Sequence, residues 1–450
     1  MTEEARPVPP GDHSGGPLPA ALELLPAGPV AMRLAAPASK SVTNRALLCA
    51  ALAEGTSHLR GAAPSDDAET MAAALSELGA GVEAGPAVWT VTGTGGRLVS
   101  PDRPLDARLS GTTMRFLAAA ATLTPAGATI TGAPPLLRRP VGPLVAVLRV
   151  LGAEVADAGD GLPPVTATGG GLEGGEATVD AGASSQFASA VLLVAPYARR
   201  PVTLAAERLG AAAYVELTAA LMGRFGAAVA PAGPAAWRVE PGPYRAADLA
   251  VEYDASAAAH LFALAAATGG TVTVTNADPG TLQPDAALPA LLEAMGATVT
   301  RDGACLTVRG PATLGPVDAD LAAMPDQVTT MAALAALAAG RSRIRGVAVT
   351  RGHETDRLAA LAAELAKLGV AVGELPDGLA VEGAGPGRLT PARLATWGDH
   401  RMAMALAAVA ARVPGVVLED PACVAKTYPG FWDDLAAAGL VWRAAAGRVQ

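Results

Sequence analysis

The stretch DHRMAMALAAVA, residues 399–410, is one of six places where a polar doublet opens an alanine-rich apolar run. The doublets follow one another at intervals of 70 to 74 residues. They are Lys40-Ser41, Ser110-Gly111, Ser184-Ser185, Asp254-Ala255, Asp326-Gln327 and Asp399-His400. A spacing this regular indicates one structural unit that is used six times along the chain. The fold can therefore be predicted from a single unit.

Each unit predicts two helices of different character and several short strands. The run after the doublet, such as residues 331–337, is apolar on all sides and is typical of a buried helix. The second helix, such as residues 355–365, carries charges on one face. Short alternating runs, as at residues 271–275 and 304–308, predict strands. The order is βαβαββ, an α/β unit, and two domains of three units or one closed ring of six both satisfy it.

The composition indicates a large chain with few classes of partner. It has 450 residues and a net charge of −9, which disfavours nucleic acid as a partner. No stretch is typical of a membrane span, so we expect no membrane partner and a cytoplasmic location. Three distant cysteines and five scattered histidines predict neither a disulfide framework nor a metal site. Residues 1–19 are rich in proline and are predicted to form a disordered tail.

Lysine is rare in this chain. Among 33 basic residues only Lys40, Lys367 and Lys426 are lysines. Lys367 stands at the end of a predicted helix, where a cation interacts favourably with the helix dipole. The other two lie among serine, threonine and other polar residues, where a compact ammonium has properties that a forked guanidinium lacks. We therefore expect Lys40 and Lys426 to belong to a functional site.

Polar helix starts in the first half of the chain predict anion binding. Residues 39–45, SKSVTNR, bring two cations and four hydrogen-bonding side chains to a helix N-terminus, where an anion is favoured. The small residues of Ser110-Gly111 and Ser184-Ser185 would let an anion approach the backbone closely. Ordinary capping by serine and threonine, with solvated charges, is the alternative interpretation.

The second half of the chain supplies candidate acid–base groups, also at helix starts. Asp326 and His400 stand at the beginning of apolar helices. Within residues 352–357, GHETDR, capping by a neighbouring residue would leave Glu354 and Arg357 free for a site. Acid–base catalysis needs one group that accepts a proton and one that donates it. For both carboxylates, capping or simple solvation is the alternative.

Five segments, in this order, resemble the 5-enolpyruvylshikimate-3-phosphate synthase family. They are residues 39–48, 184–187, 352–358, 399–404 and 425–429. The resemblance extends from about residue 30 to the end of the chain. It implies an inside-out α/β barrel of two domains with three βαβαββ repeats each, which selects the two-domain arrangement over the ring. The implied domains are residues 38–252 and residues 20–37 with 253–450, with crossovers near residues 36–39 and 250–254.

The family transfers the enolpyruvyl group of phosphoenolpyruvate to the 5-hydroxyl of shikimate 3-phosphate and releases phosphate, without a metal or cofactor. The resemblance therefore implies a 3-phosphoshikimate 1-carboxyvinyltransferase of aromatic amino-acid biosynthesis. The catalytic residues that it implies are Asp326 as base and Glu354 as acid, with help from His400 and Lys40. The residues implied for shikimate 3-phosphate are Lys40, Ser41, Arg45, Ser184, Ser185, Gln186, Tyr214, Asp326 and His353. Those implied for phosphoenolpyruvate are Lys40, Gly111, Arg139, Gln186, Arg357, Arg401 and Lys426.

Three positions depart from the pattern of the family. Residues 210–213 read GAAA where the family usually has a serine for the 3-phosphate, and His353 stands where many members have lysine. The loop that contains Gly111 leads to Phe116, where many members have proline. The first two departures bear on the affinity for the acceptor. The third bears on glyphosate, which in this family occupies the phosphoenolpyruvate pocket, and we expect weaker inhibition.

Two other functions compete with this interpretation. The UDP-N-acetylglucosamine enolpyruvyl transferase shares the fold but typically carries a cysteine in a glycine-containing loop of its third unit. None of Cys49, Cys305 and Cys423 occupies such a loop. A phosphometabolite-binding pseudoenzyme would be expected to have lost Asp326 or Glu354, and both are present. The two substrates are the partners that we expect, for a monomeric enzyme.

Overall fold

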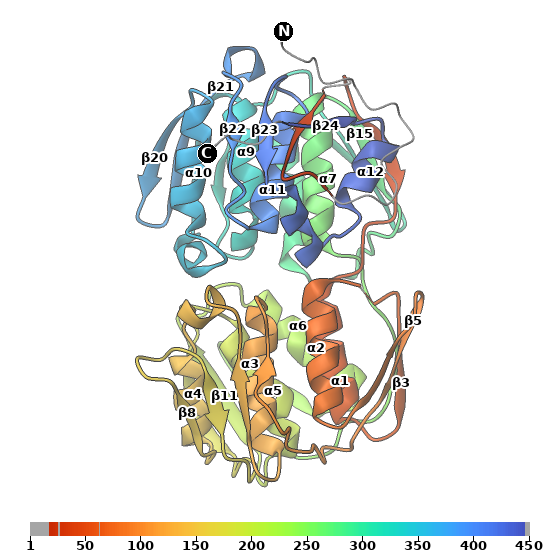
Figure 1. The fold of residues 1–450 in the computed structure, drawn as a ribbon, viewed down its shortest axis with the longest axis vertical. Coiled ribbons are helices and arrows are strands. Elements are labelled where there is room, and N and C mark those ends of the chain that lie inside the picture. Colours follow the sequence, from red (N-terminus) through yellow and green to blue (C-terminus); the bar gives the residue numbers. More distant parts are fainter. Residues whose placement is uncertain (1–17, 26–27, 63, 446–450) are drawn as a thin grey trace. The chain divides into compact units, whose positions relative to one another are not determined.

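The computed structural model describes residues 18–25, 28–62 and 64–445. The tail predicted at residues 1–19 lies outside this part, apart from its last two residues. The chain divides into two compact units, whose elements are labelled in Figure 1. Unit 1 comprises the described residues of Met1–Pro37, Ala255–Gly280 and Asp285–Gln450. Unit 2 comprises those of Ala38–Asp254 and Thr281–Pro284.

Unit 2 contains three four-stranded sheets with one shared topology among its described residues. Their strand orders are β14-β3-β5-β4, β6-β7-β9-β8 and β10-β11-β13-β12. In each sheet the first pair is parallel and the other two pairs are antiparallel. The strands are β3 (Thr56–Arg60), β4 (Gly81–Ala84), β5 (Val88–Thr92), β6 (Leu105–Asp106), β7 (Ala128–Thr131), β8 (Val155–Asp157), β9 (Val165–Ala167), β10 (Gly175–Asp180), β11 (Val202–Glu207), β12 (Val229–Gly233), β13 (Ala236–Val239) and β14 (Asp248–Ala250). The helices are α1 (Lys40–Leu52), α2 (Asp66–Glu77), α3 (Gly111–Ala120), α4 (Gly142–Val150), α5 (Gln186–Val194) and α6 (Ala213–Arg224).

Unit 1 repeats this topology three times. Its sheets run β2-β15-β17-β16, β18-β19-β21-β20 and β22-β23-β1-β24, again with one parallel pair followed by two antiparallel pairs. The strands are β1 (Ala21–Leu24), β2 (Ala31–Leu34), β15 (Thr271–Val274), β16 (Thr298–Asp302), β17 (Cys305–Arg309), β18 (Asp318–Asp320), β19 (Ala339–Arg345), β20 (Ala371–Leu375), β21 (Gly378–Ala384), β22 (Arg393–Leu394), β23 (Val417–Glu419) and β24 (Trp442–Ala444). The helices are α7 (Ala255–Thr268), α8 (Leu288–Ala294), α9 (Val328–Leu337), α10 (Arg357–Lys367), α11 (His400–Ala410) and α12 (Phe431–Ala437). Short 3₁₀ turns include η5 (Pro325–Gln327), η6 (Ala348–Gly352) and η8 (Pro421–Lys426).

Three of the six sheets are completed by a strand that lies far away in the sequence. Strand β14 comes near the end of unit 2 in the sequence. It nevertheless lies at the edge of the sheet that contains β3, β5 and β4, where it pairs with β3 in parallel. Strand β2 is the parallel partner of β15, and β1 is the antiparallel partner of β23. Every sheet therefore has the four strands of a βαβαββ repeat. The predicted six repeats, three to a unit, are confirmed.

The first helix of each repeat in unit 1 is completely buried. Every residue of α7, α9 and α11 lies in the interior, and the three helices pack against one another. Alanine dominates all three, so their backbones can approach closely while no polar face has to reach water. The prediction that apolar runs after the doublets form buried helices is confirmed here.

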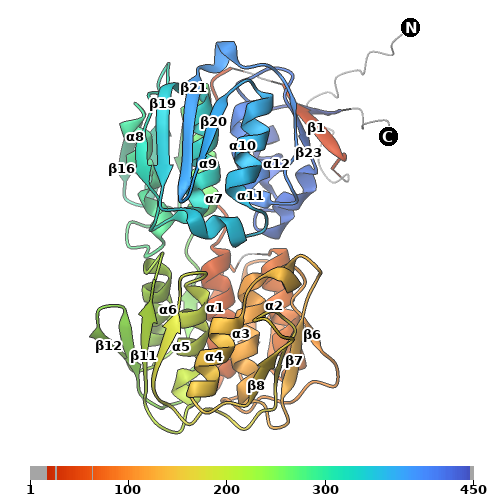
Figure 2. The same cartoon turned by 90° about the vertical axis from the view of Figure 1, so that its left-hand side faces the viewer.

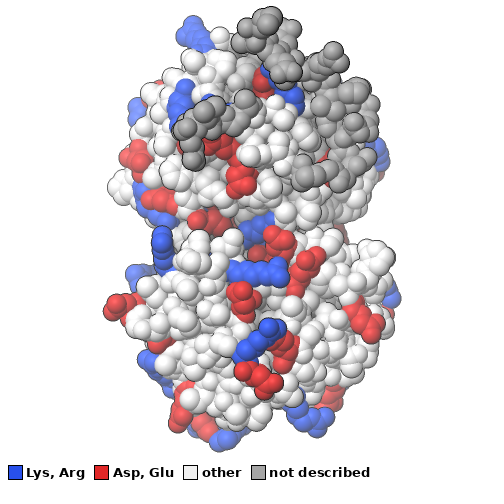
Figure 3. All heavy atoms as spheres, in the orientation of Figure 1, with Lys and Arg blue, Asp and Glu red and all other residues white. Residues whose placement is uncertain are grey.

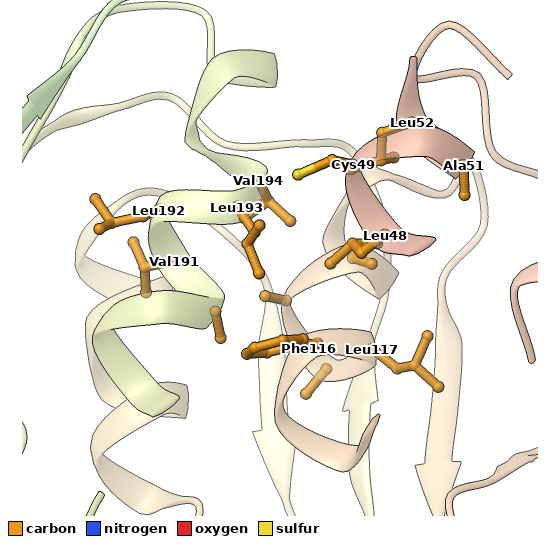
Figure 4. Close-up of a cluster of buried hydrophobic side chains, with 14 of the residues drawn as sticks. Leu48, Cys49, Ala51, Leu52, Phe116, Leu117, Val191, Leu192, Leu193 and Val194 are labelled. Carbon is orange, nitrogen blue, oxygen red and sulfur yellow. The ribbon is translucent and has the colours of Figure 1, made fainter. Parts of the chain in front are cut away.

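In unit 2 the corresponding helices α1, α3 and α5 form the centre of the hydrophobic core. Figure 4 shows side chains from all three gathered in one cluster, with Phe116 of α3 among them. Phe116 and Leu117 are fully buried, as are Leu48 and Val191 on the neighbouring helices. The core thus holds together the three helices whose first residues include the predicted anion-binding positions.

The second helix of each repeat is amphipathic, as α10 illustrates. Leu358, Leu361 and Leu365 recur at helical spacing and are buried, and α10 packs against β20 and against α9 (Figure 2). Asp356 caps α10, because its Oδ1 accepts hydrogen bonds from two backbone amides of the first turn, each at 3.1 Å. None of the helices within the described ranges is long and apolar enough to cross a membrane.

Candidate functional site

A network of ion pairs in unit 1 contains six of the predicted site residues. They are Asp326, His353, Glu354, Arg357, Arg401 and Lys426. They come from η5, from the loop between η6 and α10, from the first turns of α10 and α11, and from the end of η8. Unit 1 thus gathers side chains that are up to 100 positions apart in the sequence.

Arg357 lies at the centre of this network. Its side chain is 1% exposed and donates to three carboxylates. Nε and Nη2 contact the two oxygens of Asp399 at 2.8 and 3.3 Å, and Nη1 contacts Oδ1 of Asp326 at 2.7 Å. Nη2 also contacts Oε2 of Glu354 at 3.1 Å. Burial by itself would lower the pKa of Arg357, but the three carboxylates raise it above its usual value, so the guanidinium stays charged.

Asp326 is held as a carboxylate by two arginines. Arg401 Nη2 lies 3.0 Å from Oδ2, opposite the contact with Arg357 on Oδ1. Burial would raise the pKa of Asp326, but Arg401, His353 and Arg357 together lower it well below its usual range. Asp326 is the second residue of η5, and its side chain is not a helix cap, so the capping alternative does not hold at this position. The carboxylate is therefore ionised at neutral pH.

Glu354 bridges two of the predicted cations. Its Oε1 accepts from Lys426 Nζ at 2.6 Å, and its Oε2 from Arg357. Because Asp356 caps α10, Glu354 is left to point at these cations, as the sequence interpretation required. Three carboxylates and three cations therefore balance one another within this network.

The two predicted histidines of unit 1 lie next to different carboxylates. His353 Nδ1 is 3.3 Å from Oδ1 of Asp326 and 3.2 Å from Nη1 of Arg357. Burial lowers the pKa of His353 in spite of the nearby Asp326 carboxylate, which favours the neutral ring. His400 is buried in the first turn of α11, with Nδ1 3.7 Å from Oδ1 of Asp399.

In unit 2, the start of α1 carries three of the predicted anion ligands. Ser39 caps the helix through a contact with the amide of Val42, and the Lys40 ammonium lies 3.0 Å from Oδ2 of Asp67 on α2. The carbonyl of Ser41 accepts from Nη1 of Arg45 at 2.9 Å. The structure therefore assigns the capping role to Ser39, and Lys40 is held at the helix N-terminus by a buried carboxylate.

Arg45 is a buried cation whose partners are all uncharged. It is 2% exposed and donates to the hydroxyls of Thr218 and Ser189 and to two backbone carbonyls. The rings of Phe116 and Tyr214 lie 5.3 and 5.9 Å from its guanidinium carbon. Burial lowers the pKa of Arg45 to about 10, so it remains charged at neutral pH. Within the described part of the chain it has no acidic partner, and a buried charge of this kind favours the approach of an anionic ligand.

A second arginine group in unit 2 surrounds the start of α3. Gly111 leaves room for Arg139, because a Cβ atom at this glycine would lie 2.8 Å from Arg139 Nη1 and 3.0 Å from Arg115 Nη1. Arg115 donates to Gln186 Oε1 at 2.6 Å, and the Gln186 amide nitrogen contacts the hydroxyl of Thr112 at 3.1 Å. Gln186 is therefore fixed in orientation, and any side chain at position 111 would have to displace a guanidinium.

The remaining predicted residues of unit 2 lie at the starts of α5 and α6. Ser184 Oγ accepts from the backbone amide of Gln186 at 3.2 Å, and Ser185 is the residue before α5. Tyr214 lies in the first turn of α6, and its carbonyl accepts from Arg45. Ala211, at the departure from the family pattern, has a positive φ of 51°. Each unit thus contains its own group of predicted ligands.

Sequence reasoning missed several residues that the structure places in these groups. Asp399 is the partner of Arg357, and its side chain also accepts from the backbone amide of Arg401 at 2.9 Å. Asp67 and Arg115 hold Lys40 and Gln186. Only Asp399 gave a signal, since it belongs to one of the six doublets. Among the described residues, no group of three or more histidine, cysteine, aspartate or glutamate side chains is arranged to hold a metal ion.

Gln327, the neighbour of Asp326, belongs to a buried chain of hydrogen bonds that runs from Asp285 to His260. Asp285 accepts from the amide nitrogen of Gln327, so the amide oxygen of Gln327 faces Thr330. The Thr330 hydroxyl then donates to Gln327 and must accept from Nδ1 of His260 on α7, at 3.2 Å. His260 is therefore the neutral Nδ1–H tautomer, and its Nε2 has no hydrogen-bond partner within the described residues. Burial, together with Arg401 and Arg357, lowers the pKa of His260 to about 3.

His260 should make unit 1 sensitive to mild acid. Its pKa falls from 6.5 in the unfolded chain to about 3 in the fold, so the unfolded chain binds one more proton between these values and stability falls as the pH falls. Between pH 6.5 and 5, wild type should lose up to about 2 kcal/mol more than His260→Gln, which has no titrating ring. Urea unfolding of both proteins at the two pH values measures this. An equal loss in both would contradict the inference.

Comparisons with known proteins identify the family of this chain. Residues 25–435 match the family model described as EPSP synthase (3-phosphoshikimate 1-carboxyvinyltransferase). A 3-phosphoshikimate 1-carboxyvinyltransferase of Methanosphaerula palustris is 42% identical over 92% of this chain and 98% of its own length, and one of Nostoc punctiforme is 39% identical over 90% and 95%. An EPSP synthase structure from Acinetobacter baumannii, 26% identical, superposes with a TM-score of 0.80 over 94% of this chain and 99% of its own. The enolpyruvyl transferase NikO from Streptomyces tendae, 20% identical with a TM-score of 0.77, shares the fold. The two-domain α/β fold that the family resemblance implied is thereby confirmed, and the chain belongs to the EPSP synthase (3-phosphoshikimate 1-carboxyvinyltransferase) family.

Proposed function

We propose that this chain transfers the enolpyruvyl group of phosphoenolpyruvate to the 5-hydroxyl of shikimate 3-phosphate and releases phosphate. The observation that carries the proposal is the pair Asp326 and Glu354, two carboxylates held on the single guanidinium of Arg357. Addition to the double bond of an enol phosphate needs a base and an acid close to the same anionic reactant. Membership of the family supplies the substrate class.

The acceptor is assigned to unit 2. Arg45 has no acidic partner among the described residues, and Lys40 stands at the N-terminus of α1, so an anion with a carboxylate and a phosphate would meet two cations close to a helix N-terminus. Ser41, Ser184, Ser185, Gln186 and Tyr214 complete this group in the proposal. Asp326 and His353 are its proposed contributors from unit 1, beside the reacting hydroxyl.

Phosphoenolpyruvate is assigned to the arginine groups. In unit 1 it would meet Arg357, Arg401 and Lys426, and in unit 2 Gly111, Arg139, Gln186 and Lys40. The three cations of unit 1 form ion pairs with Asp326, Glu354 and Asp399. An incoming anion must therefore take over donors that these carboxylates now use. That exchange would leave Glu354 with fewer cationic partners and favour its protonated form.

The proposed reaction is an addition followed by an elimination. Asp326 accepts the proton of the 5-hydroxyl while the hydroxyl oxygen forms a bond to C2 of phosphoenolpyruvate. Glu354 gives a proton to C3, which becomes a methyl group. In the second step the C2–O bond to phosphate breaks, C3 returns a proton, and the double bond forms again. Lys40 and His400 are the proposed helpers in proton transfer and charge stabilisation.

Phosphate release distinguishes this proposal from the related transferase. The purified chain should release phosphate from phosphoenolpyruvate with shikimate 3-phosphate as acceptor and not with UDP-N-acetylglucosamine. Burial raises the pKa of Cys49 to about 12 and that of Cys423 to about 12, which argues against either thiol as a reactive group. Release with the nucleotide sugar alone would overturn the assignment of the acceptor.

Location and assembly are part of the proposal. On the face drawn in Figure 3, basic and acidic side chains are interspersed, which agrees with the net charge of −9 in disfavouring nucleic acid as a partner. We propose a cytoplasmic monomer whose partners are the two substrates. Sedimentation of the purified chain tests the monomer, since a dimer would sediment at twice its mass.

Glu354→Gln and Asp326→Asn should each lower kcat by about two orders of magnitude or more, because each removes one proton-transfer group. The Michaelis constant for phosphoenolpyruvate should not rise, since both substitutions release cations that the anion needs. Steady-state phosphate release measures both constants. Asp356→Asn, which changes the neighbouring carboxylate that caps α10, is the matched control and should keep kcat within about twofold. Wild-type turnover in either test variant would remove that residue from the mechanism.

Glyphosate should inhibit this enzyme more weakly than it inhibits members of the family that have proline at the position of Phe116. Phe116 continues α3 as a regular helix and places its ring against Arg45, so the start of α3 is fixed by the core. A small shift of Gly111 and Arg139 would penalise the longer inhibitor more than the smaller substrate. Inhibition measured competitively against phosphoenolpyruvate tests this. An inhibition constant well below the Michaelis constant would contradict it.

A further inference from the structure

A buried carboxylate two turns along α10 from Arg357 has no part in the proposed chemistry. Glu364 is 1% exposed and accepts three hydrogen bonds. Oε2 accepts from Lys367 Nζ at 2.6 Å and from the backbone amide of Ala395 at 2.9 Å, and Oε1 accepts from Trp397 Nε1 at 3.0 Å. Two of its three donors thus belong to the loop that leads into α11, so Glu364 ties α10 to this loop.

Trp397 is held in a conformation that a bulky residue rarely adopts. Its φ is +59°, in the left-handed region, and Gly398 follows with φ +65°. The side chain is 52% exposed, so burial of the ring does not account for the strained backbone. The contact that the structure shows for the ring is the hydrogen bond from its indole N–H to Glu364, which ties Trp397 to α10. Asp399 follows directly after Trp397 and Gly398, so the backbone conformation of these two residues determines where Asp399 lies.

Arg357 and Glu364 together clamp the loop at two points. They are seven residues apart on α10, which places them on one face, about two turns from each other. Arg357 binds Asp399, and Glu364 binds Trp397 and Ala395, so each end of the loop is held by a buried charge of opposite sign. A shift of Asp399 would move both the guanidinium that it binds and the first turn of α11, whose Arg401 amide it caps.

We propose that Glu364 and Trp397 are positioning residues, which set the place of Asp399 and through it the orientation of the anion-binding Arg357 and Arg401. The proposal rests on the assignment of these arginines to phosphoenolpyruvate. It explains why a half-exposed tryptophan stands directly before the Gly-Asp-His-Arg segment of the site. It also gives Lys367 a second role besides its interaction with the helix dipole, as the solvent-side partner of Glu364.

Two variants break the clamp without removing a site residue. Trp397→Phe keeps an aromatic ring but deletes the N–H donor. Glu364→Gln has the same shape but one acceptor oxygen in place of two, so one of its bonds to the loop is lost. Each should raise the Michaelis constant for phosphoenolpyruvate about tenfold, on the scale of a lost hydrogen bond to a charged group. The constant for shikimate 3-phosphate and kcat should stay within about twofold.

Lys367→Met is the matched control. It removes the exposed partner of Glu364 and leaves the bonds to Ala395 and Trp397 in place, so the constant for phosphoenolpyruvate should change less than about twofold. Thermal unfolding of all three variants shows whether any effect is a general loss of stability. The clamp is refuted if neither disrupting variant raises that constant, or if the lysine variant raises it equally.

A titration separates failure of the clamp from failure of the proposed function. Calorimetric titration of each variant with phosphoenolpyruvate, in the absence of shikimate 3-phosphate, measures binding to the same cations without turnover. Weaker binding in Trp397→Phe and Glu364→Gln but not in Lys367→Met supports the clamp. Wild type that binds the anion but releases no phosphate would contradict the proposed reaction and leave the test of the clamp intact. Equal binding by all four proteins would overturn the clamp.

Discussion

The contact between the buried guanidinium of Arg357 and the carboxylate of Asp399 is the interaction on which the site of unit 1 depends. Both side chains lie almost entirely in the interior, at 1% and 0% exposure, so neither can exchange its partner for water. Removing one member of such a pair leaves an uncompensated buried charge and typically costs about 3–5 kcal/mol. The pair also has a geometric consequence, because Arg357 begins α10 and Asp399 caps α11. It therefore joins the starts of two helices from successive repeats and brings Asp326 and Glu354 to one guanidinium.

The fold makes this arrangement possible through alanine. Helices α7, α9 and α11 are buried on every side, and large side chains between them would hold them apart. With small side chains the helices pack closely, and the residues at their starts come within ion-pair distance. The out-of-sequence strands β1 and β2 serve the same end, since they complete two sheets that cover these helices. A chain of six similar repeats thus forms two units, each with its own group of polar helix starts.

Much of this could be predicted from the sequence, because it follows from periodicity. The regular spacing of the doublets gave six repeats, and the apolar runs gave buried helices. The resemblance selected Asp326, Glu354, Arg357, Arg401 and Lys426, which the structure links in one network. What could not be predicted depends on contacts between distant residues. Asp399 has the sequence of an ordinary helix cap, and nothing marks it as the partner of Arg357 42 positions away. Glu364 has the sequence of a helix-surface residue, and only the left-handed turn at Trp397 brings the loop back to it.

The cations of the two units differ in their partners, and this difference links the proposed binding of anions to the proposed proton transfer. Arg45 in unit 2 is a buried charge without an acidic partner among the described residues, so an anion that reaches it would compensate an existing cost. In unit 1 the cations are already paired with carboxylates, so an anion bound there as proposed would compete with them. A displaced carboxylate that remains near the new anion is destabilised in its charged form and can be accommodated by taking up a proton. Of the carboxylates on these cations, Glu354 is the proposed acid, and this uptake would supply the proton that it gives to C3. Holding the proposed acid on the proposed ligand-binding cations would therefore make arrival of the anion the event that protonates it.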